Sequence, residues 1–302
     1  MSREDKVHSA ITRRQFLASG AYGGLALALG LRATEAWGEE GEPFAAEDPV
    51  SRVVLVRRPE AVAEEGVVDE AVVQDMVSEA VRRFAGQEDA PAAWARFVNP
   101  EDTVGIKYTR GGPVITEPAV EKAVIEGVHT AGVPAERITS RDGGHNPADY
   151  TALINVPSVK VHAICGIAVS LKNYINFVSN CSQYHEESGR RLGSIWRQPE
   201  IEGKTRLIVV DMLRPYAAHG PQVEPQYRWN YCGILLATDP VAVDTVCLAI
   251  CQNKRDQLQG EPWPIQPPAR AIPAADKEYG LGTSDPTKIR LERFGWMEDA
   301  LI

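Results

Sequence analysis

Residues 103–141, with the sequence TVGIKYTRGGPVITEPAVEKAVIEGVHTAGVPAERITSR, decide the fold. The first six of these residues form a largely apolar run that predicts a strand over 103–108. Apolar residues then recur at helical spacing over 117–131, and residues 137–141 predict a second strand. A strand, a helix and a strand in immediate succession indicate a βαβ unit with two parallel strands.

Residues at both ends of this helix are typical of helix caps. Thr116 is the expected N-cap, Pro118 falls in the first turn, and Gly132 is the expected left-handed residue that ends the helix. The same alternation continues on both sides of the unit. Further strands are expected over residues 52–57, 151–156, 160–164, 206–213 and 233–237, and further helices over residues 69–84 and 240–252.

This alternation predicts an α/β protein: a layered fold in a single large domain, with a largely parallel or mixed sheet flanked by helices. We expect the domain to span residues 52–302, with a Pro-rich extended strap over 261–273. In such folds ligands bind beyond the carboxyl ends of the strands. The strand ends are therefore the places to search for a site.

The N-terminal segment is typical of an export signal. Arg13 and Arg14 stand just before a run of small and apolar residues from 18 to 31. The pattern resembles the twin-arginine signal, an address that a receptor reads on proteins that have already folded. The run is shorter than the roughly 20 residues that a membrane-spanning helix needs. An ordinary secretory signal or a membrane anchor is the alternative.

We accordingly expect residues 1–36 to be a signal peptide and residues 37–51 to be an acidic linker. The expected location is periplasmic or otherwise extracytoplasmic, and the export machinery is the expected partner of Arg13 and Arg14. No other apolar run reaches membrane length, so no stable anchor is expected once the signal is removed. The formal charge of −9 argues against nucleic acid and against an anionic membrane surface as partners.

The five cysteines are an odd number, and none belongs to a Cys-x-x-Cys pair. We expect buried free thiols with one or two disulfide bridges, since free cysteine is among the most buried residue types. The alternative is an iron–sulfur cluster or another redox centre held by Cys165, Cys181 and Cys232. Cys247 and Cys251 are four residues apart on a predicted helix and are expected in the core.

Polar clusters follow two of the early strands. Lys107 stands just before a glycine pair at 111–112, and this combination suits a carboxylate or a phosphate. The sequence Asp-Gly-Gly-His-Asn at 142–146 sets Asp142 close to His145. A solvated loop and an ordinary turn are the alternative readings of these clusters.

The richest cluster runs from Asn155 to Asn173. Lys160 and His162 are two residues apart, so a strand would project both side chains from one face. Burying both in an apolar segment is costly unless they are paired or bind something. Lys172 and Asn173 follow the next apolar run, and an amphipathic strand with a wet edge is the alternative.

Four more polar positions belong to the candidate site. His185 follows Cys181 by four residues, a spacing that places both on one face if the segment is helical. Asp211 directly follows the apolar residues 207–210 of a predicted strand, and His219 follows in a turn. Asp244 lies among apolar residues of a predicted helix, so it needs a buried partner.

These clusters give the expected roles. The expected catalytic residues are Lys160, Lys172 and Asp142. The expected cofactor-binding residues are Lys107, Asn173, Asp211 and Asp244. The expected metal ligands are His145, His162, His185 and His219.

The motifs resemble those of a bacterial and archaeal family of unknown function, numbered 362. The resemblance rests on Lys-x-His at 160–162, Leu-Lys-Asn at 171–173 and Asp-Pro-Val-Ala-Val-Asp at 239–244, and it extends from about Val53 to Gly282. Many members look like Lys-x-Asn where this chain has Lys-Tyr-Thr at 107–109. Some relatives carry a ferredoxin-like module with closely spaced cysteines, which this chain lacks. The resemblance implies no established reaction.

The sequence therefore predicts an exported α/β protein whose strand ends hold a metal- or cofactor-dependent site for a small anionic molecule. The cofactor is unknown, with a divalent metal favoured over an iron–sulfur cluster. A non-catalytic protein that binds small anions and a redox protein are the alternatives. Whether the chain is an enzyme stays open.

Overall fold

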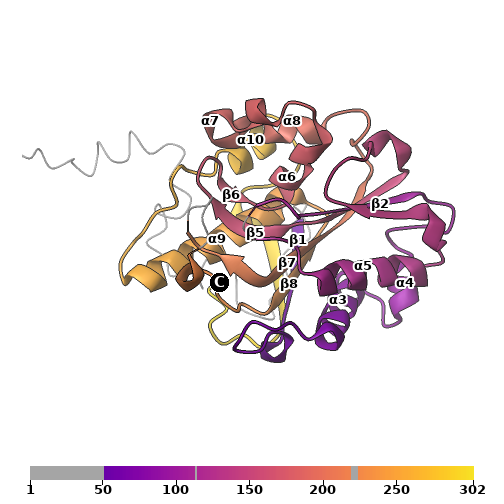
Figure 1. The fold of residues 1–302 in the computed structure, drawn as a ribbon, viewed down its shortest axis with the longest axis horizontal. Coiled ribbons are helices and arrows are strands. Elements are labelled where there is room, and N and C mark those ends of the chain that lie inside the picture. The colour runs from indigo at the N-terminus through magenta and orange to yellow at the C-terminus, as the bar shows by residue number, and fades with distance from the viewer. Residues whose placement is uncertain (1–50, 113, 219–223) are drawn as a thin grey trace, which may run out of the picture.

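The computed structural model describes residues 51–112, 114–218 and 224–302. The predicted signal peptide, almost all of the acidic linker and His219 lie outside these residues. The described residues form a nine-stranded sheet with the main order β3-β2-β4-β7-β8-β1-β9, and β5 pairs with β7 and β6 (Figure 1). Its strands are β1 (Ser51–Arg57), β2 (Val104–Tyr108), β3 (Ile138–Arg141), β4 (Ala152–Val156), β5 (Ser158–His162), β6 (Gly166–Ala168), β7 (Thr205–Tyr216), β8 (Gly233–Ala237) and β9 (Ile289–Gly295).

The sheet is mixed, as predicted. Strands β3, β2, β4 and β7 run parallel to one another, and β5 is parallel to β7. Strand β8 is antiparallel to both β7 and β1, whereas β1 and β9 are parallel. The quoted segment forms the expected βαβ unit, with the parallel strands β2 and β3 joined through a helix.

Helices cover both faces of the sheet. One group is α3 (Glu70–Ala85), α4 (Ala90–Trp94) and α5 (Pro118–Thr130). The other is α6 (Ser170–Asn173), α7 (Glu186–Gly189), α8 (Gly193–Trp196), α9 (Pro240–Gln259) and α10 (Ala271–Lys277). Figure 1 shows α3, α4 and α5 on the side of the sheet away from α6, α7, α8 and α10.

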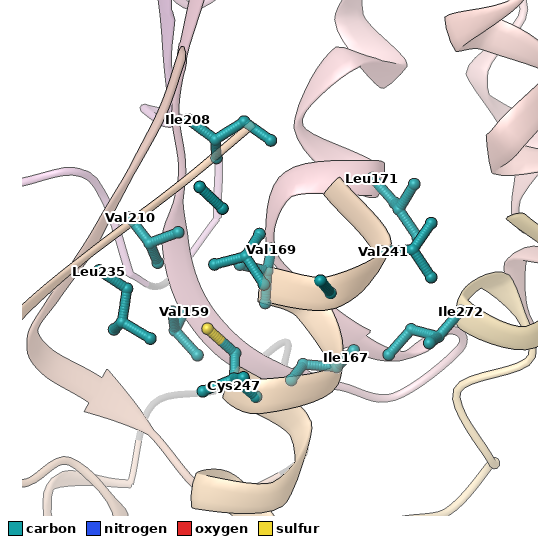
Figure 2. Packing of buried hydrophobic residues seen from close by; sticks show 14 of the residues in the cluster. Val159, Ile167, Val169, Leu171, Ile208, Val210, Leu235, Val241, Cys247 and Ile272 are labelled. Atoms are coloured by element: carbon teal, nitrogen blue, oxygen red, sulfur yellow. The ribbon is translucent and has the colours of Figure 1, made fainter. Parts of the chain in front are cut away.

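Alternation along β1 shows how the two layers form, because successive side chains of a strand point to opposite faces. Val54 and Val56 belong to the core under α3, α4 and α5. Val53 and Leu55 belong to the core under α6, α9 and α10. Figure 2 shows part of the second core, where side chains of β5, β6, β7 and β8 pack around helix α9 and its Cys247.

Short 3₁₀ helices occupy several connections. They are Pro59–Ala61, Ala135–Arg137, Pro147–Asp149, Tyr174–Phe177, Cys181–Tyr184, Arg190–Leu192, Pro225–Tyr227 and Pro286–Lys288. Among the described residues no helix is both long enough and apolar enough to cross a bilayer.

Some predicted boundaries need correction. Thr116 is not the N-cap of α5: Glu117 takes that position, and the Thr116 hydroxyl instead donates to the Val156 carbonyl at 2.8 Å. The strand expected over 160–164 is β5, which begins at Ser158 and ends at His162, and the short β6 follows it after a turn. The predicted strap holds no helix or strand over 261–270, but it ends earlier than expected, since helix α10 begins at Ala271. Strand β9 was not predicted, and α9 runs to Gln259 rather than residue 252.

Candidate functional site

A cavity of about 490 Å³ lies beyond the carboxyl ends of β2 and β3. Its walls come from the loop after β2, from Asp142 just after β3, from β5, from α6 and from the segment that carries Cys181 and His185. Because β2 and β3 are parallel, their ends meet at one edge of the sheet and bring two polar loops together. The cavity therefore lies where an α/β sheet is expected to bind a ligand.

Strand β5 presents alternate side chains to this cavity. Ser158, Lys160 and His162 all line it, as the spacing of two residues predicts. Lys160 is only 7% exposed, and its Nζ donates to the Val114 carbonyl at 2.9 Å and to Ser158 Oγ at 3.3 Å. Burial, reinforced by the charge of Lys172, lowers the pKa of Lys160 to about 8.

Helix α6 brings a second amine to the cavity. Lys172 lines it and lies close enough to Lys160 for their charges to interact. Burial also lowers the pKa of Lys172. Within the described part of the chain, neither Lys160 nor Lys172 forms an ion pair with a carboxylate. The cavity therefore holds two amines without a direct ion pair, and the charge of Asp142, which lines the same cavity, acts on Lys160 only from a longer distance.

Asp244 fixes the position of α6. Its Oδ1 accepts from the Ser170 N–H at 2.9 Å and its Oδ2 accepts from the Leu171 N–H at 3.0 Å. These are the buried partners that the sequence required for Asp244. The carboxylate lies behind the cavity wall rather than in it, so its predicted cofactor-binding role becomes that of a positioning residue for Lys172.

Lys107 is fully buried and all three of its donors are used. Its Nζ donates to Asp142 Oδ1 at 2.7 Å, to Asn173 Oδ1 at 3.0 Å and to the Tyr108 carbonyl at 2.7 Å. Burial lowers the pKa of Lys107 to about 8, against the opposing effect of Asp142. With three acceptors for three N–H groups, Lys107 has no donor left for a ligand. Its predicted contact with a cofactor is replaced by a contact that orients Asp142.

Asp142 lines the cavity and accepts a hydrogen bond from Lys107. Its Oδ2 accepts from the Gly111 N–H and its Oδ1 also accepts from Asn176 Nδ2, each at 3.0 Å. Partial burial raises the pKa of Asp142, but the hydrogen bond and charge of Lys107 outweigh this effect and hold the pKa below its ordinary value. Asp142 is therefore an ionised carboxylate at the cavity wall.

Asn173 links the two polar loops. Its Nδ2 donates to the Lys107 carbonyl at 2.9 Å and to Asn155 Oδ1 at 2.7 Å. Its Oδ1 accepts from Lys107 Nζ and from Thr109 Oγ1, each at 3.0 Å. An amide side chain offers two donors and two acceptor positions, and all four are occupied. Asn173 thus holds the wall together and has no free group for the cofactor contact that the sequence predicted.

His162 and His185 lie together in the cavity, with ring centroids 5.7 Å apart. The Nδ1 of His162 accepts from the N–H groups of Ile164 and Cys165, both at 3.2 Å. Burial, helped by the charge of Lys172, lowers the pKa of His162 to about 3, so the ring is neutral. Because Nδ1 accepts, the proton of this neutral ring is assigned to Nε2, which can then donate to a ligand.

The predicted four-histidine metal site does not form among the described residues, where no three His, Cys, Asp or Glu side chains are grouped to hold a metal ion. His145 is the histidine that departs from the prediction. Its Nδ1 bonds Tyr150 Oη at 2.9 Å and its ring packs against Phe177. His219 lies outside the described residues.

Asp211 also departs from its predicted role. It is buried and accepts from the N–H groups of Glu117 at 2.7 Å and Leu213 at 2.9 Å. These bonds attach the start of α5 to β7, away from the cavity lining. Asp211 is therefore a structural residue.

All five cysteines are free thiols, and four of them are buried. This confirms the expectation of buried thiols, and the one or two bridges that were also expected do not form. Cys247 and Cys251 lie in the core, as predicted. Cys232 belongs to the core on the other side of the sheet from Cys181, so the described cysteines do not form the trio that an iron–sulfur cluster would need.

Sequence reasoning missed two lining residues with clear contacts, Ser158 and Asn176. Ser158 accepts from Lys160, and its alternation with Lys160 along β5 was the available signal. Asn176 holds Asp142 across a long stretch of chain, which no local pattern indicates. Gly112 belongs to the predicted glycine pair and does line the cavity beside Lys160, where an added Cβ would be 3.8 Å from Lys160 Cε.

Comparison with known proteins adds one match. Residues 144–249 match the family described as "Domain of unknown function (DUF362)". This confirms the resemblance over a segment that holds Lys160, His162, Lys172 and Asp244, and it is shorter than the span that the motifs suggested. No curated protein and no solved structure matches the chain.

Proposed function

We propose that the cavity binds a small organic anion through Lys160 and Lys172. The observation that carries the proposal is that both amines face the cavity while neither forms an ion pair with a carboxylate in the described ranges. Desolvated amines without counter-charge are unfavourable, and an anion between them would supply that charge. The donor assigned to His162 Nε2 would add a hydrogen bond to the same ligand.

The remaining walls favour an anion with an apolar part. Val169 and Ile175 are buried residues at the cavity, and Ile164 lines it with 52% of its surface exposed. Such a combination of apolar walls and a few convergent polar groups is typical of small-molecule sites. We therefore favour an organic acid with a short hydrocarbon chain over a fully hydrophilic anion.

Binding can be tested by thermal shift and calorimetry with 4-methylpentanoate and its neutral amide. We expect the acid, but not the amide, to stabilise the protein. Lys172→Met should weaken binding of the acid by about tenfold to a hundredfold, because a hydrogen bond to a charged group contributes about 1.5–3 kcal/mol.

Lys122→Met is the matched control, since Lys122 is exposed and pairs with Glu70 on the surface, away from the cavity lining. It should bind the acid like the unmodified protein. Equal affinity of the Lys172→Met and Lys122→Met variants, or equal binding of the acid and the amide, would show that the two cavity amines do not form an anion site.

We also propose export by the twin-arginine route, on the evidence of Arg13 and Arg14 before the small, apolar run. The full chain should be recovered outside the cytoplasm of a bacterium that has the twin-arginine machinery. It should stay in the cytoplasm of a strain that lacks it, and so should the variant with both Arg13→Lys and Arg14→Lys. Export that persists in both cases would favour the ordinary secretory alternative.

A further inference from the structure

Among the described residues, the amine of Lys160 has two hydrogen-bond acceptors. Its Nζ lies 2.9 Å from the Val114 carbonyl oxygen and 3.3 Å from Ser158 Oγ. The Ser158 hydroxyl donates to the same Val114 oxygen at 2.8 Å, so its own oxygen is free to accept from Lys160. An uncharged amine has two N–H groups and one lone pair. The two acceptors satisfy both N–H groups and leave the lone pair for the cavity.

The surroundings of Lys160 make this uncharged form accessible near pH 8. The side chain is 7% exposed, and in the described structure its amine forms no ion pair with a carboxylate. Burial and the nearby positive charge of Lys172 outweigh the opposing charge of Asp142 and lower the pKa of Lys160 to about 8. A lysine that is desolvated next to another cation is an activated nucleophile.

Space is left beside the reactive end of Lys160. Gly112 has φ of +88°, and a Cβ there would lie 3.8 Å from Lys160 Cε. The glycine both permits this left-handed backbone and keeps the neighbourhood of the amine free of a side chain. A ligand carbon can therefore approach the amine from the cavity.

We propose that Lys160 forms an imine with a 2-oxo acid, an inference that rests on the proposed anion-binding function. The Lys160 nitrogen attacks the ketone carbon and forms a C–N bond, while the π electrons of the C=O bond move to oxygen. The nitrogen lone pair then forms the second C–N bond as the C–O bond breaks, and the oxygen leaves as water with the two amine protons. No electron is gained or lost, so the step needs neither an oxidant nor a reductant.

A 2-oxo acid carries one group suited to the chemistry of each amine. The carboxylate pairs with the Lys172 ammonium while the adjacent ketone carbon meets Lys160. Its hydrocarbon chain then contacts the apolar wall at Ile164 and Ile175. A simple acid satisfies only the charge, and a simple ketone satisfies only the nucleophile.

The test uses the full chain, 4-methyl-2-oxopentanoate and cyanoborohydride, at a pH near the pKa of Lys160. We expect the mass of the protein to increase by one reduced adduct, located at Lys160 by peptide mass analysis. Lys160→Arg should prevent the adduct, and Lys122→Met should leave it unchanged. An adduct spread over many lysines, or one retained at the same yield in Lys160→Arg, overturns the inference.

A second ligand separates this inference from the proposed function. The corresponding 2-hydroxy acid has the carboxylate and the hydrocarbon chain but no ketone. If both acids raise the melting temperature and no adduct forms, the imine is wrong and the anion site stands. If neither acid binds, both proposals fail.

Discussion

Lys160→Met should change how the stability of the protein depends on pH. The pKa of Lys160 is lowered from 10.5 to about 8 in the folded protein, chiefly by burial. Between these two values the unfolded chain binds a proton that the native protein does not. Stability therefore rises with pH across this window.

The size of the effect follows from the shift. The difference between 10.5 and about 8, at 1.36 kcal/mol per pKa unit, corresponds to an increase of roughly 3 kcal/mol once the window has been crossed. Lys160→Met removes the titrating group, so the difference in unfolding free energy between the two proteins should change by about this amount. At neutral pH the variant avoids the cost of a buried ammonium but loses two hydrogen bonds of about 1 kcal/mol each. We expect it to be as stable as the unmodified protein there, or slightly more stable.

The assay is urea unfolding of both proteins at a series of pH values between 7 and 10.5, the ordinary pKa of lysine. Only the difference between the two curves is used, because other groups titrate in both proteins. Lys122→Met serves as the control and should follow the unmodified protein. Parallel curves for the unmodified protein and Lys160→Met across the whole window would refute the reasoning.

Three further predictions concern the residues that hold the cavity wall and the effect of pH on binding. Asp244→Ala should lower the free energy of unfolding by about 2–6 kcal/mol, because two buried N–H groups lose their acceptor, and it should also weaken binding of the acid. The control Val243→Ala should lower the free energy of unfolding without changing binding of the acid. A double-mutant cycle by urea unfolding with Lys107→Met and Asp142→Asn should give a coupling of about 1–3 kcal/mol, and additive effects would contradict the pairing. Binding of 4-methylpentanoate should weaken as pH rises above about 8, the pKa at which Lys160 loses its charge, and calorimetry that finds constant affinity would count against Lys160 as a cationic contact.

Local sequence patterns were sufficient to predict the helices and strands whose bounds depend on neighbouring residues. The apolar run, the helical spacing and Gly132 predicted β2, α5 and the end of that helix, because each depends on neighbours in sequence. The spacing of Lys160 and His162 predicted a shared face for the same reason. The burial of Asp244 among apolar residues predicted a partner but not its identity, since Ser170 and Leu171 lie more than 70 residues away.

Long-range contacts explain what could not be predicted. Strand β9 is held by its pairing with β1, which lies more than 200 residues earlier in the sequence. Its own residues include charged side chains, so its sequence does not read as a buried strand. The composition of a loop cannot show that all donors of Lys107 are used within the protein. Likewise the four histidines lie close in sequence to other residues of the predicted site. His145 nevertheless hydrogen-bonds Tyr150 and packs against Phe177, and it does not contact the other imidazoles of the described residues.

Lys107 and Lys160 differ in one respect: Lys107 forms an ion pair with a carboxylate and Lys160 does not. Both lysines are buried, and burial lowers the pKa of each to about 8. Lys107 is paired with Asp142, which lines the same cavity, whereas among the described residues Lys160 has only a carbonyl and a hydroxyl as acceptors. The chain has 41 acidic residues against 32 basic ones, so carboxylates are not scarce. A buried lysine without a counter-charge lowers stability, and such a cost is typical of a functional site. This contrast is the physical reason to place the ligand at Lys160 and Lys172 rather than at Lys107.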